Sequence, residues 1–225
     1  MLQEDKMDIK KLIEDKVDSF NKQGYIHLKN VIEPNIVAET RNLAIQLRKK
    51  YKGQEGQDRT EGGGIFWKGL EMASILDTRL WGLYTHPNMK EIAKTFLQIE
   101  EPYLYNDQVV VKLPNDNFHF HEHCDNDHVV DPEGAKQGKF KTINCCQILT
   151  NMTDPEVGPL CVTNLDTGDK DIILANAGDI VIIDGNTPHT SKPNTSSKIR
   201  ALYACVYSSH PIGKFKSGFY NEKFQ

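Results

Sequence analysis

Residues 185–200 read Gly-Asn-Thr-Pro-His-Thr-Ser-Lys-Pro-Asn-Thr-Ser-Ser-Lys-Ile-Arg, and this stretch combines a histidine, a serine and an arginine at close spacing. Ser191 follows His189 by two residues, and Arg200 follows it by 11. An imidazole can bind a metal ion, and a guanidinium presents a planar fork of donors that matches a carboxylate. When a short turn joins two antiparallel strands, such a pair can face one cavity. The stretch therefore predicts paired strands that hold a metal ion and a carboxylate ligand.

A second group of metal-binding side chains lies upstream, where residues 118–128 read Phe-His-Phe-His-Glu-His-Cys-Asp-Asn-Asp-His. Alternate residues of an extended strand share a face. We therefore expect one common face for four of these side chains, namely His119, His121, His123 and Asp125. His123-Cys-Asp125 is a His-x-Asp pair, and with His189 it supplies two imidazoles and one carboxylate. Three such ligands occupy one face of an octahedral Fe(II) ion, so iron together with a carboxylate anchor suggests an oxo-acid cosubstrate.

Length and composition indicate an ordinary globular protein. With 225 residues, the chain is expected to form one domain over 1–225 that is large enough to enclose a cavity. A net charge of −4 argues against a general nucleic-acid binder, and no stretch approaches the roughly 20 apolar residues that cross a bilayer. No signal peptide is readable at the amino terminus. The five cysteines form no CxxC pair, and their odd number predicts reduced thiols and a cytoplasmic location.

The pattern of apolar residues changes from helical to strand-like along the chain. Helical spacing over residues 9–20 predicts a helix that stops near Gly24, and further helices are expected from Pro34 onward and over residues 87–98. Residues 54–64 predict a loop, and Phe66 and Trp67 after it could anchor that loop or close over a substrate. Short strands are expected at 103–113, 118–125, 141–150, 160–163, 171–174, 179–184 and 199–207. This texture predicts a mainly β sandwich or jelly roll over about 103–208, buttressed by helices from about 1–100.

These segments resemble the phytanoyl-CoA dioxygenase family of Fe(II)/2-oxoglutarate-dependent oxygenases. The resemblance covers most of the chain and is most specific at His189-Thr-Ser191 with Arg200, where order, spacing and residue type all match. The other matching segments are 20–31 followed by Glu33-Pro34, Lys112-Leu-Pro114, 144–149, 158–162 and 178–184. The resemblance implies a double-stranded β-helix, that is, a cupin-like jelly roll. It also implies a dioxygenase that hydroxylates a small molecule and releases succinate and carbon dioxide.

Carried over to this chain, the resemblance assigns roles to individual residues. His123, Asp125 and His189 would bind Fe(II), while Arg200 would bind the distal carboxylate of 2-oxoglutarate with help from the Ser191 hydroxyl. Three further residues complete the set: Asn144 lies opposite the expected 2-oxoglutarate site, and Gln108 and His121 are candidate substrate contacts. The histidine of the family usually follows an aromatic residue, as His121 follows Phe120, so His121 is the alternative to His123 as the first ligand. Dioxygen and a small molecule are the expected partners, and the sequence leaves the oligomeric state open.

Two other functions would use the same residues. A non-catalytic, cupin-like binding or sensor protein could hold a metal ion and an acid without oxidising anything. A zinc-dependent hydrolase could be built from His-x-His and a third histidine. Arg200 argues against the hydrolase, because zinc hydrolysis has no inherent need for an arginine at this spacing.

Overall fold

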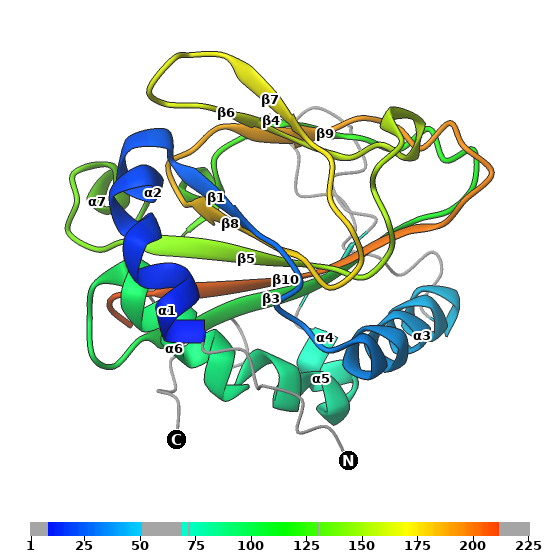
Figure 1. Ribbon diagram of the computed structural model, residues 1–225, viewed down its shortest axis with the longest axis horizontal. Helices are drawn as coiled ribbons and strands as arrows, with labels where there is room; N and C mark the ends of the chain where they lie inside the picture. The colour runs from blue at the N-terminus through cyan, green and yellow to red at the C-terminus, as the bar shows by residue number, and fades with distance from the viewer. Residues whose placement is uncertain (1–8, 51–68, 72, 130, 212–225) are drawn as a thin grey trace.

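The computed structural model describes residues 9–50, 69–71, 73–129 and 131–211, whose strands form two antiparallel sheets (Figure 1). The larger sheet has six strands in the order β1-β8-β5-β10-β3-β2, and the smaller has four in the order β4-β9-β6-β7. The larger sheet contains β1 (Tyr25–Leu28), β2 (Gly69–Glu71), β3 (Tyr103–Lys112), β5 (Thr142–Ile148), β8 (Ile180–Asp184) and β10 (Arg200–Ser208). The smaller contains β4 (Phe120–His123), β6 (Leu160–Thr163), β7 (Lys170–Ile173) and β9 (His189–Ser191).

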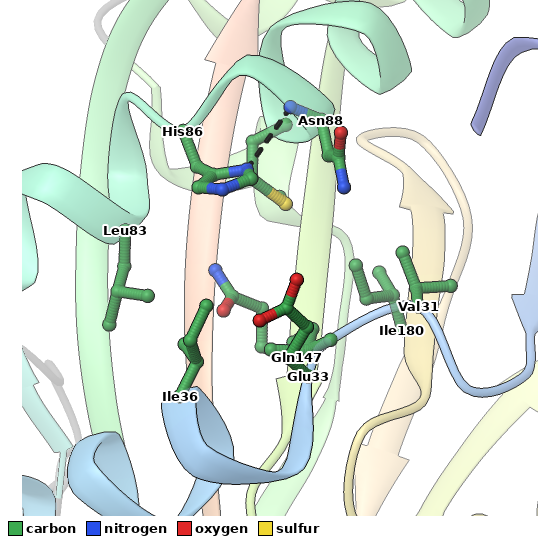
Figure 2. Close-up of a pocket in the computed structure, with 10 residues that line it drawn as sticks. Val31, Glu33, Ile36, Leu83, His86, Asn88, Gln147 and Ile180 are labelled. Carbon is green, nitrogen blue, oxygen red and sulfur yellow. Dashed lines mark hydrogen bonds between the residues drawn. The ribbon is translucent and has the colours of Figure 1, made fainter. Parts of the chain in front are cut away.

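Helices cover the face of the larger sheet that is turned away from the smaller sheet (Figure 1). The amino-terminal part contributes α1 (Ile9–Ile13), the 3-10 helix η1 (Glu14–Lys16), α2 (Val17–Gln23) and α3 (Pro34–Lys50). They are followed by α4 (Ala73–Leu76), α5 (Thr78–Tyr84) and α6 (Pro87–Leu97). Between α3, α5, α6 and the sheet lies a cavity (Figure 2). The later helices are short, namely η2 (Asp125–His128), α7 (Pro132–Lys136) and η3 (Pro155–Val157).

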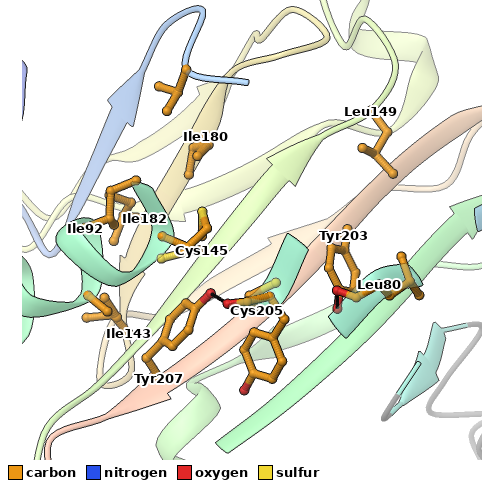
Figure 3. Close-up of a cluster of buried hydrophobic side chains, with 14 of the residues drawn as sticks. Leu80, Ile92, Ile143, Cys145, Leu149, Ile180, Ile182, Tyr203, Cys205 and Tyr207 are labelled. Carbon is orange, nitrogen blue, oxygen red and sulfur yellow. Dashed lines mark hydrogen bonds between the residues drawn. The ribbon is translucent and has the colours of Figure 1, made fainter. Parts of the chain in front are cut away.

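The central strands of the larger sheet contribute to two apolar layers. On β5, Ile143 and Cys145 face the helices, whereas Cys146 and Ile148 face the smaller sheet. In the layer under the helices, Leu80 of α5 and Ile92 of α6 pack over strands β5, β8 and β10 (Figure 3). Burying each such side chain stabilises the fold by roughly 1.5–3 kcal/mol. Because both faces of the larger sheet are buried, its strands are held rigidly and can position polar side chains between the sheets.

Most of the secondary structure expected from the sequence is confirmed. The helix expected over residues 9–20 is divided into α1, η1 and α2. As expected, helical structure stops at Gly24, which has a positive φ of 80° and donates its N–H to the Phe20 carbonyl oxygen over 2.8 Å. The last long helix begins at Pro87 and ends one residue earlier than expected. The mainly β, two-sheet fold with helices on one side also agrees with the expectation. None of the described helices is long and apolar enough to cross a membrane.

One expected strand is wrong in its extent. The strand predicted over 118–125 is limited to Phe120–His123, and Asp125 begins the 3-10 helix η2 instead. The predicted loop at 54–64, with Phe66 and Trp67, lies outside the described residues.

Candidate metal centre

Three candidate ligands converge between the ends of two paired strands and the helix that follows. His123 ends β4 and lies opposite His189, the first residue of β9, and Asp125 starts η2 directly after β4. The Nε2 atoms of His123 and His189 lie 3.7 and 3.6 Å from Asp125 Oδ1. The potential ligand atoms of the three residues all lie within 4.8 Å of one another. This group could therefore hold one metal ion.

The remaining ring nitrogens of the two histidines are already engaged. His123 Nδ1 lies 2.8 Å from the backbone oxygen of His121, and His189 Nδ1 lies 3.0 Å from that of Thr187. Since a carbonyl oxygen only accepts, each Nδ1 carries the proton and each Nε2 keeps a lone pair. Burial, and then the neighbouring His189, lower the pKa of His123, which keeps this ring neutral. Both rings are thus in the tautomer that binds a metal through Nε2.

The Asp125 carboxylate is oriented in the same way. Asn144, on the central strand β5, donates an Nδ2 hydrogen to Asp125 Oδ2 over 2.9 Å. Oδ1 remains directed at the two histidines. The sequence suggested Asn144 as a cosubstrate contact, and in the structure its amide contacts the carboxylate ligand. Two imidazole nitrogens and one carboxylate oxygen form the donor set that suits non-haem Fe(II).

A register shift in β4 separates His121 from this group. Phe120 and His123 are three residues apart but pair with β9 residues that are only two apart. Both therefore face the smaller sheet's inner side, where their rings stack with centroids 6.2 Å apart. His121 is exposed, and its ring contacts the exposed ring of His119. The expectation of one common face for the four residues is therefore wrong, because regular alternation stops at the shift.

Arg200 lies buried at the start of β10, and its side chain is without an acceptor. The residue is 1% exposed, and none of its three guanidinium nitrogens has a hydrogen-bond partner among the described residues. Burial lowers the pKa of this guanidinium to about 10. An unpaired buried cation is costly, so a protein that retains one generally supplies its partner from elsewhere. The arrangement indicates a binding site for an anion.

A second buried basic side chain lies beside the first. Lys112 pairs with Arg200 in the register of β3 and β10, and its side chain is fully buried. Its Nζ donates to Ser191 Oγ over 2.8 Å and also contacts the backbone oxygens of Ser191 and Lys192. Burial, and then the charge of Arg200, lower the pKa of Lys112 to about 6. The Ser191 oxygen accepts from Lys112, so its hydroxyl hydrogen is available to a bound anion. Sequence analysis gave Lys112 no role of its own, although it continues the alternation of Gln108 and Val110.

The connection between β9 and β10 is tied to the end of β3. Asn194, fully buried, donates Nδ2 hydrogens to the backbone oxygens of Leu113 and Lys198 over 2.9 and 2.7 Å. Its Oδ1 accepts from the N–H and the hydroxyl of Ser196. This network fixes the path of the chain between His189 and Arg200. The sequence carries one local signal for this network, the turn-forming Pro193-Asn194 pair.

Two polar groups of β3 remain without partners. The Nε2 atom of Gln108 and the Oδ1 atom of Asn106 are buried and lack hydrogen bonds within the described part of the chain. Gln108 shares the parity of Val110, which packs between the two sheets. A buried donor and a buried acceptor that lack partners are suited to contact a polar ligand. The contact between Gln108 and a substrate stays a prediction.

The fold and the site together define a class, the cupin-like jelly-roll proteins with a candidate two-histidine, one-carboxylate centre. The α-ketoglutarate-dependent non-heme carbocyclase SnoK from nogalamycin biosynthesis has this fold. It superposes with a TM-score of 0.72 at 18% identity, over 89% of this chain and 85% of that chain. EctD from S. alaskensis, solved with 2-oxoglutarate and 5-hydroxyectoine, gives 0.69 at 19% identity, over 86% and 74%. AviO1 from Streptomyces viridochromogenes Tue57 gives 0.71 at 16%, over 90% and 98%.

The sequence itself points to one family. The model of the phytanoyl-CoA dioxygenase (PhyH) family matches residues 170–202, which include His189, Ser191 and Arg200. The predicted resemblance to this family is thereby confirmed over that segment, and the solved structures above share the fold over most of the chain. A comparison with curated proteins gave no match.

Proposed function

We propose that this protein is an Fe(II)- and 2-oxoglutarate-dependent dioxygenase that hydroxylates a small molecule and releases succinate and carbon dioxide. The observation that carries the proposal is the buried guanidinium of Arg200, which lacks a hydrogen-bond partner among the described residues. Its cross-strand neighbour Lys112 contacts Ser191, which follows a candidate metal ligand by two residues. A metal centre alone would not need this cation. An oxo acid that chelates iron at one end and carries a carboxylate at the other accounts for both features.

Three side chains would bind the iron, and a fourth would orient one of them. His123 and His189 would bind Fe(II) through Nε2 and Asp125 through Oδ1, while Asn144 would keep the carboxylate turned toward the ion. With Fe(II) and 2-oxoglutarate bound, the centre would supply dioxygen activation coupled to decarboxylation of the oxo acid.

The distal carboxylate of 2-oxoglutarate would lie against Arg200, where a planar guanidinium can form two parallel hydrogen bonds. Ser191 would donate its hydroxyl hydrogen to the same carboxylate, because Lys112 already donates to the serine oxygen. The positive charge of Lys112 would strengthen the attraction. Arg200 and Lys112 would thus act as one anion-binding unit.

The substrate contact that we propose is Gln108, whose Nε2 is buried without a partner. This donor favours a small polar substrate. His121, the other candidate, is exposed outside the metal group, so we assign it no contact with the iron. All five cysteines are free, which supports the expected cytoplasmic location.

Anaerobic titration of the metal-free protein with Fe(II) and 2-oxoglutarate tests the proposal. Chelation should produce a visible metal-to-ligand charge-transfer band that saturates near one equivalent of each component. The variant His189→Ala should lose the band, and His121→Ala should retain it. Absence of the band in the folded wild-type protein would contradict the proposal.

Oxygen use then separates an enzyme from a binding protein. Succinate released in step with dioxygen consumption supports the dioxygenase. A saturable band with no succinate, even with a screened substrate set, would favour the cupin-like sensor. Zinc retained through purification, with hydrolysis that does not depend on 2-oxoglutarate, would favour the hydrolase.

A further inference from the structure

The cavity on the helix-covered face of the larger sheet lies away from the candidate metal centre. Its space, including the open mouth, is about 390 Å³. It is bounded by the β1–α3 connection, α3, α5, α6 and strands β5 and β8 (Figure 2). Asn144 and Gln147 are both on β5, but Asn144 contacts Asp125 on one face, whereas Gln147 lines this cavity on the other. The two sites are therefore separated by the thickness of the sheet.

The walls of the cavity are apolar, and a few polar groups point into it. The apolar lining consists of Val31, Ile32, Ile36, Leu83, Met89 and Ile180. The Glu33 carboxylate and the Gln147 amide extend into the same space (Figure 2). A concave apolar surface with a small number of polar groups is the usual form of a small-molecule site.

Gln147 has an amide oxygen that the protein does not use. The residue is 2% exposed, and its Nε2 donates to Cys205 Sγ over 3.4 Å. Its Oε1 accepts no hydrogen bond from any residue that the structure describes. An acceptor at the wall of a cavity can take a hydrogen bond from a donor in that cavity. A ligand in the cavity could supply that donor.

The charge of the lining favours a cationic ligand. Glu33 brings a full negative charge, and no lysine or arginine is among the lining residues. The N-terminus of α6 borders the cavity and carries about half a positive charge. His86 Nδ1 already accepts the N–H of Asn88 there, over 3.2 Å. The full negative charge of Glu33 exceeds the partial positive charge of this partly capped helix end, so the net charge that faces the cavity is negative.

We propose that this cavity binds a small amphiphilic amine. The ammonium group would donate to the Glu33 carboxylate and to Gln147 Oε1. The hydrocarbon part would lie between Ile36, Leu83 and Met89. The proposal does not depend on the metal centre or on the proposed oxygenase activity.

Methyl NMR of the full-length protein, labelled at methionine and isoleucine methyl groups, tests the proposal. Hexylammonium should shift the Met89 and Ile36 signals in a saturable way. Hexanoate and 1-hexanol, which have the same chain length, should bind more weakly by about threefold or more. Absence of saturable shifts, or equal or tighter binding of hexanol or hexanoate, would overturn the amine assignment.

Matched variants locate the ligand head. Glu33→Gln keeps the size of the side chain and should weaken hexylammonium binding by about threefold or more. Gln147→Met should weaken it as well, because the acceptor is lost while the bulk is kept. Glu39→Gln removes the same charge from an exposed position on the helix that follows, α3, outside the cavity lining, and should change nothing. Binding that is insensitive to both Glu33→Gln and Gln147→Met would overturn the proposal.

Discussion

Replacement of Arg200 by methionine should change stability and cosubstrate binding in opposite directions. Methionine fills much of the same buried volume but carries no charge and no donors. In the protein without ligand, the guanidinium is 1% exposed and unpaired among the described residues, so its loss removes a cost. With 2-oxoglutarate bound, the same guanidinium would pair with a carboxylate, so its loss removes an attraction.

The size of the stability change follows from the pKa of Arg200. An exposed guanidinium has a pKa well above 10, and one pKa unit corresponds to about 1.4 kcal/mol. Burial lowers the pKa of Arg200 to about 10, so the buried charge costs about 3 kcal/mol. Both pKa values lie above 7, so the whole cost applies at neutral pH and fades only as the pH rises above about 10. Arg200→Met should therefore raise the free energy of unfolding by up to about 3 kcal/mol, and Tm by as much as about 10 °C.

Binding should respond in the other direction. Removing one partner of a buried charge pair costs about 2–5 kcal/mol, which is a loss of affinity of about 30-fold to several thousandfold. Isothermal titration calorimetry with Mn²⁺ in place of Fe(II) would measure the affinity for 2-oxoglutarate, and differential scanning calorimetry would measure Tm. The control is Arg79→Met, because the side chain of Arg79 is 68% exposed and pairs with Asp77 at the surface. A destabilised Arg200→Met variant with unchanged affinity would refute the reasoning and make Arg200 a structural residue.

Three further predictions concern the metal centre and the anion site. Asn144→Ala should lower metal affinity about 10- to 100-fold, because Asp125 loses the donor that orients its carboxylate. Competition with a chelator would measure the affinity, and an unchanged value would contradict the orienting role of Asn144. His123→Ala should abolish metal binding, whereas His121→Ala should leave it intact, and the reverse result would make His121 the ligand. The pKa of Lys112 is about 6 without ligand, and a bound anion raises it, so binding takes up a proton above pH 6. At saturating metal, the affinity for 2-oxoglutarate should therefore fall by up to about tenfold per pH unit above pH 6. Lys112→Met should remove this pH dependence, and a pH dependence that persists in the variant would assign it to another group.

The strands and their inward faces could be read from the sequence because alternation and turn residues are local signals. On β10, Arg200 has the same parity as Leu202 and Ala204, which pack between the sheets, and it is buried as they are. The two sheets and the buttressing helices also agree with the expected fold class. The order of motifs along the chain was sufficient to place His189 near the His-x-Asp pair, and in the structure these three residues come together.

The rest depends on contacts between distant segments. The register shift that turns His121 away arises from the pairing of β4 with β9, which lies far along the chain. Lys112 meets Arg200 only because β3 and β10 pair in one particular register. The cavity around Gln147 depends on how α3, α5 and α6 settle on the sheet. Periodicity within a segment carries no information about these contacts.

The register shift in β4 also indicates where the length of this chain can vary. Without Glu122, Phe120 and His123 would be two residues apart, like the β9 residues that they face. The strand would then be regular, and both side chains would keep their inward direction. The interval between His123 and Asp125, in contrast, spans the turn from strand to 3-10 helix that brings Oδ1 to the histidines. Insertions and deletions among related chains should therefore be found between Phe120 and His123 and be absent between His123 and Asp125.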